Sequence, residues 1–263
     1  MEPVLEVKNL TMDFRGLRAL DSLDLDVFKQ EIVALIGPNG AGKTTFFNCI
    51  TGIYAPTKGE MLISRPGKNT KKRLNGLKPN LVTEIGLART FQNIRLFANM
   101  TVLENVMIGR HCRMKSGIAG AVFKNKGTVD EEKRVVQESY NLLKKFGLGQ
   151  FVNELASNLP YGAQRRLEIA RAMATDPFIL LLDEPAAGMN TRETRELIDL
   201  IVRIRNQENI SILLIEHDMK LVMTLSDRIY VVDYGKKIAQ GTPDQIKNNT
   251  AVIKAYLGED TDA

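Results

Sequence analysis

The sequence predicts an α/β protein with a mostly parallel sheet covered by helices, and two observations support this prediction. In the C-terminal half, strand-length apolar runs alternate with helical segments, as in FILLLD from Phe178, TRETRELIDLIVRIRN from Thr191 and SILLIEHD from Ser211. This alternation is typical of parallel strands joined by crossover helices. Nearer the N-terminus, the apolar run IVALI from Ile32 leads through a glycine-rich loop into another helix.

The rest of the chain is assigned in order. The first 63 residues predict short strands and turns around one helix. Two basic inserts without acidic residues follow, at 65–83 and 110–127. We expect the first to be a solvated loop and the second to pack on its own domain, with contact to lipid headgroups or a partner as the alternative. Between the inserts, Thr101 and Glu104 predict a helix with a capping box. After them, Thr128 and Glu131 predict a second capping box at the start of an amphipathic helix, and Gly147 predicts the end of that helix.

Composition limits the possible classes of protein. The 263 residues carry a net charge of +5, which favours anionic surfaces without specifying nucleic acid, lipid or an acidic protein. The two cysteines, Cys49 and Cys112, form no CxxC pair, so we expect a reduced cytoplasmic protein. No apolar run approaches the roughly 18 residues of a membrane span, and the N-terminus is not a signal peptide. A role at a membrane would therefore require docking on another protein.

The strongest local signal is GPNGAGKTT, from Gly37 to Thr45, which matches the phosphate-loop pattern G-x-x-x-x-G-K-[ST] between a strand and a helix. Glycines let the backbone curl so that its N–H groups face a phosphate, and the helix start adds its positive dipole end. Lys43 can reach the β- and γ-phosphates, and Thr44 offers a hydroxyl to Mg²⁺. The predicted nucleotide-binding residues of the loop are Gly37, Pro38, Asn39, Gly40, Ala41, Gly42, Lys43, Thr44 and Thr45.

Two later strands end in side chains suited to hydrolysis. Asp183 ends FILLLD, and Glu184 follows it. Ligands bind at the carboxyl ends of strands in open α/β sheets, and adjacent side chains there point in different directions. We therefore expect Asp183 to help hold Mg²⁺ and Glu184 to orient or deprotonate the attacking water. His217 follows SILLIE, and we expect it to contact the γ-phosphate or the water.

Three further features are ambiguous from residue type alone. Gln92 could be ordinary polar surface, and Phe14 could belong to the core. The stretch NLPYGAQRRLEIARAM from Asn158 begins a helix with a glycine turn, but it carries no nucleophile and no metal ligand. A helix N-terminus of this kind suits a phosphate, although the stretch lies far along the chain from the first phosphate loop.

Taken together, these motifs resemble the ATP-binding cassette (ABC) family over essentially the whole chain. GPNGAGKTT resembles its Walker A motif, ILLLDEP its Walker B motif with the catalytic glutamate, and LPYGAQRRLEIARAM its signature helix. The resemblance implies that Gln92 is the Q-loop residue and His217 the switch histidine, and that Phe14 stacks on adenine. It also implies catalytic roles for Lys43, Gln92, Glu184 and His217, Mg²⁺ ligation by Thr44, Gln92 and Asp183, and ATP contacts in trans from Pro160, Tyr161, Gly162 and Ala163.

Within the family, EIGLARTFQNIRLFANMTVLENV and LLIEHDMKLVM are similar to the ATPases of branched-chain amino acid importers. The implied fold is a single cassette over 1–263 with a mixed-sheet, RecA-like core. The core and an antiparallel β subdomain would occupy about 1–92 and 175–240. A helical signature subdomain would occupy 93–174, followed by a C-terminal helical extension at 241–263.

The resemblance also implies cofactors, partners and a location. The cofactors would be ATP and Mg²⁺. The partners would be a second cassette (a paralogue or another copy), two membrane permease subunits and, indirectly, a periplasmic binding protein, with no nucleic acid. The chain would then be peripheral at the cytoplasmic face of the inner membrane.

This sequence departs from the family pattern at two positions. Pro160 stands where the signature has serine, and it has neither a hydroxyl nor an N–H to offer a phosphate. We therefore expect the ATP site that this signature completes to be weaker than the other. Asn190 stands where many relatives have aspartate, and we expect it to cap the following helix together with Glu193.

Other functions remain open from the sequence. The importer could carry urea, amides or other amino acids. A soluble ABC ATPase of DNA repair or translation is disfavoured, because the chain has neither a long coiled coil nor a second cassette, and its basic inserts lack interleaved aromatics. A P-loop kinase or GTPase finds support only in NKGT from Asn125, which lacks the aspartate of the guanine motif. The presence of Glu184 and His217 argues against a nucleotide-gated adaptor that hydrolyses ATP poorly.

Overall fold

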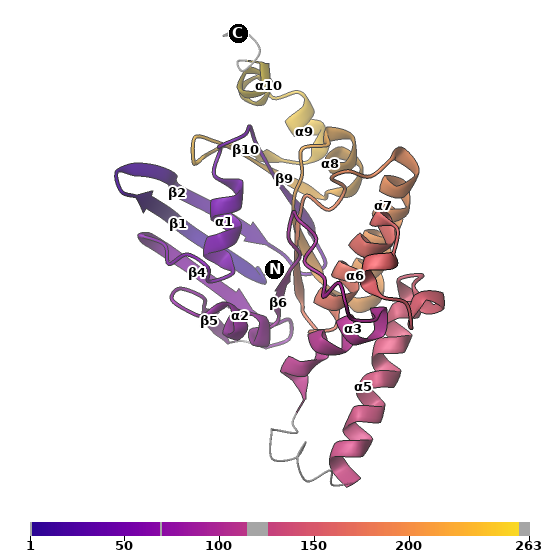
Figure 1. The fold of residues 1–263 in the computed structure, drawn as a ribbon. Coiled ribbons are helices and arrows are strands. Elements are labelled where there is room, and N and C mark those ends of the chain that lie inside the picture. Colours follow the sequence, from indigo (N-terminus) through magenta and orange to yellow (C-terminus); the bar gives the residue numbers. More distant parts are fainter. Residues whose placement is uncertain (1, 69, 115–125, 258–263) are drawn as a thin grey trace.

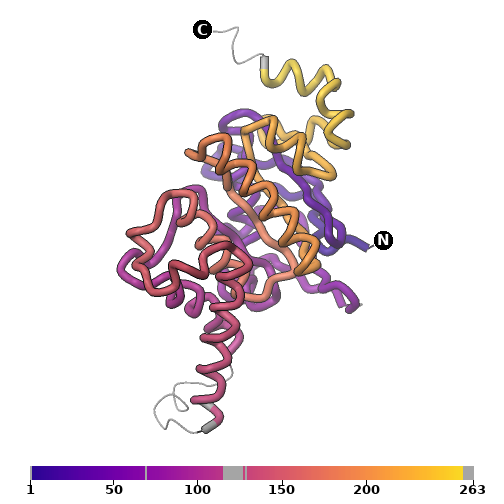
Figure 2. The backbone as a smooth tube through the Cα atoms, turned by 90° about the vertical axis from the view of Figure 1, so that its right-hand side faces the viewer, coloured from indigo at the N-terminus to yellow at the C-terminus, as the bar shows by residue number. Residues whose placement is uncertain are grey.

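The computed structural model describes residues 2–68, 70–114 and 126–257. The apolar part of the second basic insert, 118–123, lies outside the described residues. Two β-sheets lie side by side, and helices pack between them and over the outer face of the second sheet (Figure 1). In Figure 2, α5 projects from one end of the molecule, and α9 and α10 lie at the opposite end.

The first sheet is antiparallel and comes almost entirely from the N-terminal 73 residues. Its order is β2-β1-β4-β5, formed by β1 (Leu5–Phe14), β2 (Leu17–Val27), β4 (Lys58–Ser64) and β5 (Lys71–Arg73). The expectation of a loop throughout 65–83 is wrong, because β5 is an edge strand within it. Lys71 pairs with Glu6 at 3.0 Å, and the adjacent Leu74 is buried, so the strand is held at both ends despite its charge.

The second sheet is mixed, as expected. Its order is β10-β9-β3-β8-β7-β6; the five strands from β9 to β6 are parallel, and β10 is antiparallel. The strands are β3 (Ile32–Ile36), β6 (Leu87–Arg89), β7 (Ile179–Asp183), β8 (Ser211–Ile215), β9 (Arg228–Asp233) and β10 (Lys236–Gly241). β3, β7 and β8 are buried throughout, which is why their sequences are continuous apolar runs rather than alternating ones.

The helices begin and end largely where their caps predict. Two predicted capping boxes form, Thr101 with Glu104 before α3 and Asn190 with Glu193 before α7. The third prediction, Thr128 with Glu131 at the start of a helix, is wrong, because α5 already begins at Lys126 and Thr128 lies within it. No described helix combines the length and the apolar character that a membrane crossing needs. The described α-helices are α1 (Lys43–Ile50), α2 (Pro79–Ile85), α3 (Val102–Arg110), α5 (Lys126–Lys145), α6 (Tyr161–Met173), α7 (Thr191–Glu208), α8 (Met219–Leu225), α9 (Pro243–Lys247) and α10 (Thr250–Leu257).

The second sheet separates two hydrophobic cores. Along β3, Val33 and Leu35 join the core that contains Phe46 and Phe47 of α1, together with the first sheet. The alternate residues of β3 face the other core, which contains Leu167 of α6 and the inner side of α7. The helix after the phosphate loop and the signature helix therefore cover opposite faces of one sheet.

Candidate functional site

The phosphate loop, residues 37–42, joins β3 to α1 in a turn that only glycine can make at two positions. A Cβ atom on Gly37 would collide with the carbonyl oxygen of Val232. Gly42 has φ of 100° and caps α1, and a Cβ atom there would lie 2.6 Å from the carbonyl oxygen of Ala19. The loop is thus fixed between two strands, and it leads directly into the unpaired N–H groups of a helix start.

Lys43 is folded back over this loop. Its Nζ donates to the carbonyl oxygens of Gly37 at 2.6 Å and Pro38 at 2.7 Å, so the ammonium group lies at the loop's centre. Thr44 is exposed and Thr45 half-buried in the first turn of α1. The rest of the loop is exposed at Asn39 and Gly40 and buried at Pro38 and Ala41.

Asp183, at the end of β7, is nearly buried and is already paired. Nη2 of Arg89, on the adjacent strand β6, lies 2.7 Å from Oδ2 of Asp183, and both side chains are 6% exposed. The sequence analysis missed Arg89. Its signal was a charged residue inside the short apolar segment IGLART, because a buried charge requires an opposite charge as partner.

Two predicted catalytic residues converge on the carboxylate of a third. Nε2 of Gln92 donates to Oε2 of Glu184 at 2.7 Å, and Nδ1 of His217 lies 3.7 Å from the same oxygen. The backbone of Glu184 is left-handed, with φ of 45°, and its N–H donates to Ile215 of the neighbouring strand. Such strained backbone is concentrated at functional sites, where the surrounding fold holds it in place.

Glu216, which the sequence analysis also missed, holds the turns after β7 and β8 together. It is 2% exposed, and its carboxylate accepts hydrogen bonds from the N–H of Ala186 at 2.9 Å and of His217 at 3.1 Å. Burial raises the pKa of this carboxyl group, while the backbone N–H groups around it oppose that rise. Glu216 therefore fixes the backbone that carries His217 relative to the segment after Glu184.

The predicted signature turn contacts the segment that follows Glu184 in its own chain. Pro160 is the N-cap of α6 and makes no side-chain capping bond. The hydroxyl of Tyr161 donates to the carbonyl oxygen of Ala187 at 2.9 Å. Gly162 and Ala163 are buried, and a Cβ atom on Gly162 would lie 2.8 Å from Oε1 of Glu193. This packing is a second reason for glycine at 162, besides any approach to a phosphate.

Farther along α6, a buried ion pair binds the backbone of the Q-loop around Gln92. Nη1 of Arg165 lies 2.8 Å from Oε2 of Glu168, and the two side chains are 0% and 2% exposed. Arg165 donates to the carbonyl oxygens of Phe91 at 2.7 Å and Gln92 at 2.8 Å, and Glu168 accepts from the N–H groups of Phe91 and Arg95. The signature helix thus positions the main chain on both sides of Gln92.

Phe14 lies in the β1–β2 hairpin, the same hairpin that contacts Gly42 through Ala19. Its ring is 36% exposed and stacks edge-on against Tyr54, with centroids 5.3 Å apart. One part of the ring is therefore buried against the protein, and another part faces solvent.

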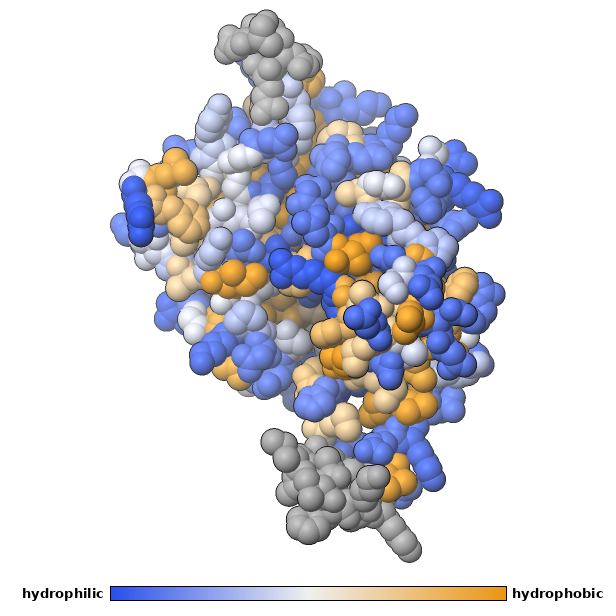
Figure 3. Space-filling view, in the orientation of Figure 1, coloured by the Kyte–Doolittle hydropathy of each residue, from blue (hydrophilic) through white to orange (hydrophobic). Residues whose placement is uncertain are grey.

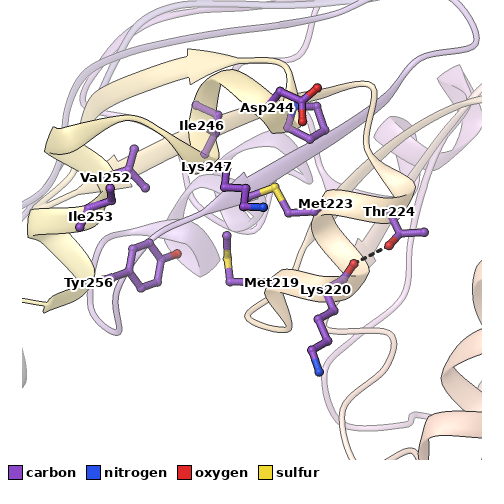
Figure 4. A pocket seen from close by; sticks show the side chains of 11 residues that line it. Met219, Lys220, Met223, Thr224, Asp244, Ile246, Lys247, Val252, Ile253 and Tyr256 are labelled. Carbon is purple, nitrogen blue, oxygen red and sulfur yellow. Dashed lines mark hydrogen bonds between the residues drawn. The ribbon is translucent and has the colours of Figure 1, made fainter.

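A cavity of about 850 Å³ lies away from these residues, between α8, α9 and α10. Met219 and Met223 line one side, and Val252, Ile253 and Tyr256 line the other (Figure 4). A second cavity, of about 660 Å³, opens beside the Q-loop and is lined by β6, α3 and α6. Among the described residues, no three His, Cys, Asp or Glu side chains cluster as a ready-made metal site.

Comparison with known proteins gives consistent matches. A family model described as "ABC transporter" matches residues 20–187, and one described as "Branched-chain amino acid ATP-binding cassette transporter" matches residues 236–262. The chain is 50% identical to the high-affinity branched-chain amino acid transport ATP-binding protein LivG of Escherichia coli K12 over 258 residues, which cover 98% of this chain and 99% of LivG. It is 48% identical to BraF of Pseudomonas aeruginosa, a protein of the same description, over 257 residues and 98% of each chain. The fold is similar to the ADP conformation of MJ1267, an ATP-binding cassette of an ABC transporter, with a TM-score of 0.84 and 28% identity over 98% of this chain and 100% of that one.

Proposed function

The chain belongs to the ABC transporter family, and we propose that it is the ATP-hydrolysing subunit of an importer for branched-chain amino acids. The observation that carries the proposal is the convergence of Gln92 and His217 on Oε2 of Glu184. A side-chain pair directed at one carboxylate oxygen suits the activation of a water molecule. The proposed specificity for branched-chain amino acids rests on the 50% sequence identity to LivG over nearly the whole chain.

In the proposed reaction, the amides of the phosphate loop and Lys43 bind the β- and γ-phosphates. Glu184 accepts a proton from the attacking water, and Gln92 and His217 hold that water in line with the γ-phosphate. Catalysis would come from positioning and charge neutralisation rather than from a covalent intermediate. Phe14 would stack on adenine with its exposed face.

The residues present also fit a Mg²⁺ ion. Thr44 is exposed beside the loop, Asp183 lies at the end of β7, and Gln92 retains its amide oxygen because its nitrogen donates to Glu184. Mg²⁺ is usually held by one or two protein oxygens together with substrate phosphates and water, so this sparse set is sufficient. When bound, the ion would neutralise charge on the phosphates.

We further propose that a second cassette completes the ATP site with its signature turn. The placement of α1 and α6 on opposite faces of one sheet supports this, because the two helix starts then serve different nucleotides. Pro160, Tyr161, Gly162 and Ala163 would contact the partner's ATP, where the partner is a paralogue or another copy. Residues 93–174 would move as the helical subdomain, against a core of 1–92 and 175–240 with the extension 241–263.

The cavity beside the Q-loop is our candidate permease contact. Phe97 and Ile108 are exposed at its rim, and Arg95 and Arg171 add positive charge. Figure 3 shows hydrophobic residues gathered near α3 on a face that is otherwise largely hydrophilic. Docking here would place the chain at the cytoplasmic face of the inner membrane, below two permease subunits, with a periplasmic binding protein acting from the other side.

The test is reconstitution of the purified complex with its permeases and partner cassette in vesicles. Binding protein loaded with leucine, isoleucine or valine should stimulate ATP hydrolysis and uptake. Urea, a short amide and a polar amino acid serve as competitors. Stimulation by one of these instead of leucine would overturn the specificity, and salt-sensitive DNA binding without permease association would overturn the importer proposal.

A further inference from the structure

Arg89 places a fixed positive charge inside the proposed catalytic site. Besides its 2.7 Å pair with Asp183, its Nη1 donates to Oδ1 of Asn48 at 2.7 Å and to Oγ1 of Thr51 at 3.3 Å. Asn48 belongs to α1, the helix that follows the phosphate loop, and Thr51 is the C-cap of that helix. One side chain therefore joins the strand that ends in Asp183 to the helix that follows the loop.

Aromatic rings restrict the guanidinium further. It lies over the ring of Phe47 in α1, 5.4 Å from the centroid, and over that of Phe91, 5.1 Å away, next to Gln92. A planar guanidinium can stack on rings while donating several hydrogen bonds, which an ammonium group cannot do equally well. The position of Arg89 is thus set by three elements of the site, so its charge cannot swing away from Asp183.

The ion pair with Arg89 changes how strongly the carboxylate of Asp183 attracts a metal ion. A carboxylate at a strand end attracts a divalent cation by its charge, but a cation 2.7 Å from Oδ2 largely cancels that charge in a poorly hydrated environment. We propose that Arg89 is a positioning residue for Asp183: it occupies Oδ2, leaves Oδ1 for the metal side, and makes metal binding depend on the nucleotide's phosphates. The inference rests on the proposed ATP site, and it predicts that the site binds Mg²⁺ only weakly when no nucleotide is present.

The decisive measurement is Mn²⁺ binding to the full chain, followed by the electron paramagnetic resonance signal of free Mn²⁺, with and without ATP. Arg89→Gln removes the charge and should tighten Mn²⁺ binding without nucleotide on the order of ten-fold. The charge-conserving Arg89→Lys should remain within about two-fold of the wild type. Adding Asp183→Asn to Arg89→Gln should abolish the gain. Unchanged nucleotide-free binding in a folded Arg89→Gln protein would overturn the proposal.

A second variant decides the matter even if Arg89→Gln does not fold. In the otherwise natural chain, Asp183→Asn should weaken Mn²⁺ binding at least ten-fold with ATP and less than two-fold without it. Equal losses in both conditions would show that Asp183 binds metal by itself, contrary to the proposal. Binding of a fluorescent ATP analogue in excess EDTA tests the ATP site separately, so its absence would instead refute the proposed function.

Discussion

The phosphate region, where β7 and β8 end beside the phosphate loop, differs from the signature helix α6 in how it uses charge. In the phosphate region, Glu184 is partly exposed, has left-handed backbone and interacts with the side chains of Gln92 and His217. In α6, Arg165 and Glu168 are fully enclosed and interact mainly with backbone groups. The first arrangement keeps a carboxylate available for chemistry, whereas the second uses a charged pair to hold a loop in shape.

Gln92 belongs to both regions. Its side chain reaches Glu184, and its carbonyl oxygen accepts from Arg165. A shift of α6 would therefore move the backbone of a residue that contacts the proposed base. In the proposed pair of cassettes, this contact would give a physical route by which ATP bound at the signature turn changes the chain's own site.

The largest expected effect comes from removing the base in the phosphate region. Glu184→Gln keeps the size of the side chain but cannot accept a proton, so ATP turnover should fall about 10²–10⁴-fold while ATP binding persists. Phosphate release by the assembled transporter measures the loss, and gel filtration with ATP should reveal a trapped pair of cassettes. Glu196→Gln, on the exposed side of α7, is the matched control. Rapid turnover by Glu184→Gln would contradict the assignment of the base.

The comparison predicts a different outcome for the pair in α6. Arg165→Met leaves Glu168 buried without its cation and should lower the free energy of unfolding by about 3–5 kcal/mol. Urea denaturation measures this free energy of unfolding. The control variant Arg192→Met, which disrupts the exposed pair with Glu196, should change it by less than about 1 kcal/mol. The double variant Arg165→Met, Glu168→Leu should recover much of the loss. Equal stability of the two single variants would show that the enclosed pair in α6 does not hold the structure more firmly than an exposed pair does.

The two cysteines test the packing of α1, which follows the phosphate loop, and of the segment after α3 separately. Cys49 is buried in α1, and burial raises the pKa of its thiol to about 11, which leaves on the order of a hundred-fold less thiolate at pH 8 than an ordinary cysteine has. Cys112 is exposed just after α3; burial raises its pKa as well, but its sulfur can be reached. A maleimide should therefore label one thiol in the native chain and two in denaturant. Fast native labelling of Cys49 would mean that α1 is loosely packed.

The smallest effect concerns the signature turn. Pro160→Ser supplies a side-chain cap that α6 lacks, worth about 1 kcal/mol, and a hydroxyl for the partner's phosphate. Turnover of the assembled transporter should rise several-fold, and thermal unfolding should shift upward slightly. Pro160→Ala, which has no hydroxyl, is the control for the removal of proline itself. A rise in stability without a rise in turnover would count against unequal ATP sites.

Local sequence was sufficient for most of the fold. Continuous apolar runs such as IVALI identified the buried parallel strands, and the capping residues Thr101 and Asn190 identified helix starts, because both signals are local. β5 was missed because its three residues are charged and exposed, so its strand conformation depends on pairing with β4, which lies outside the local window.

The candidate site was predictable where a motif concentrates its chemistry and unpredictable where partners are distant in sequence. Lys43, Glu184 and His217 stand in local patterns. Arg89 pairs with Asp183 across 94 positions, and Arg165 contacts Phe91 across 74, so neither contact has a local signature. For the same reason, the backbone groups that Arg165 and Glu168 hold could not be named from the sequence.

The left-handed backbone of Glu184 has an evolutionary consequence. Such a conformation costs a side-chain-bearing residue about 1 kcal/mol or more, whereas glycine and asparagine adopt it readily. Directed selection for heat tolerance alone would therefore favour the replacement of this glutamate. The resulting proteins would be more stable but would no longer hydrolyse ATP. An acid at this strained position is therefore what selection for ATP hydrolysis, and not for stability, would produce.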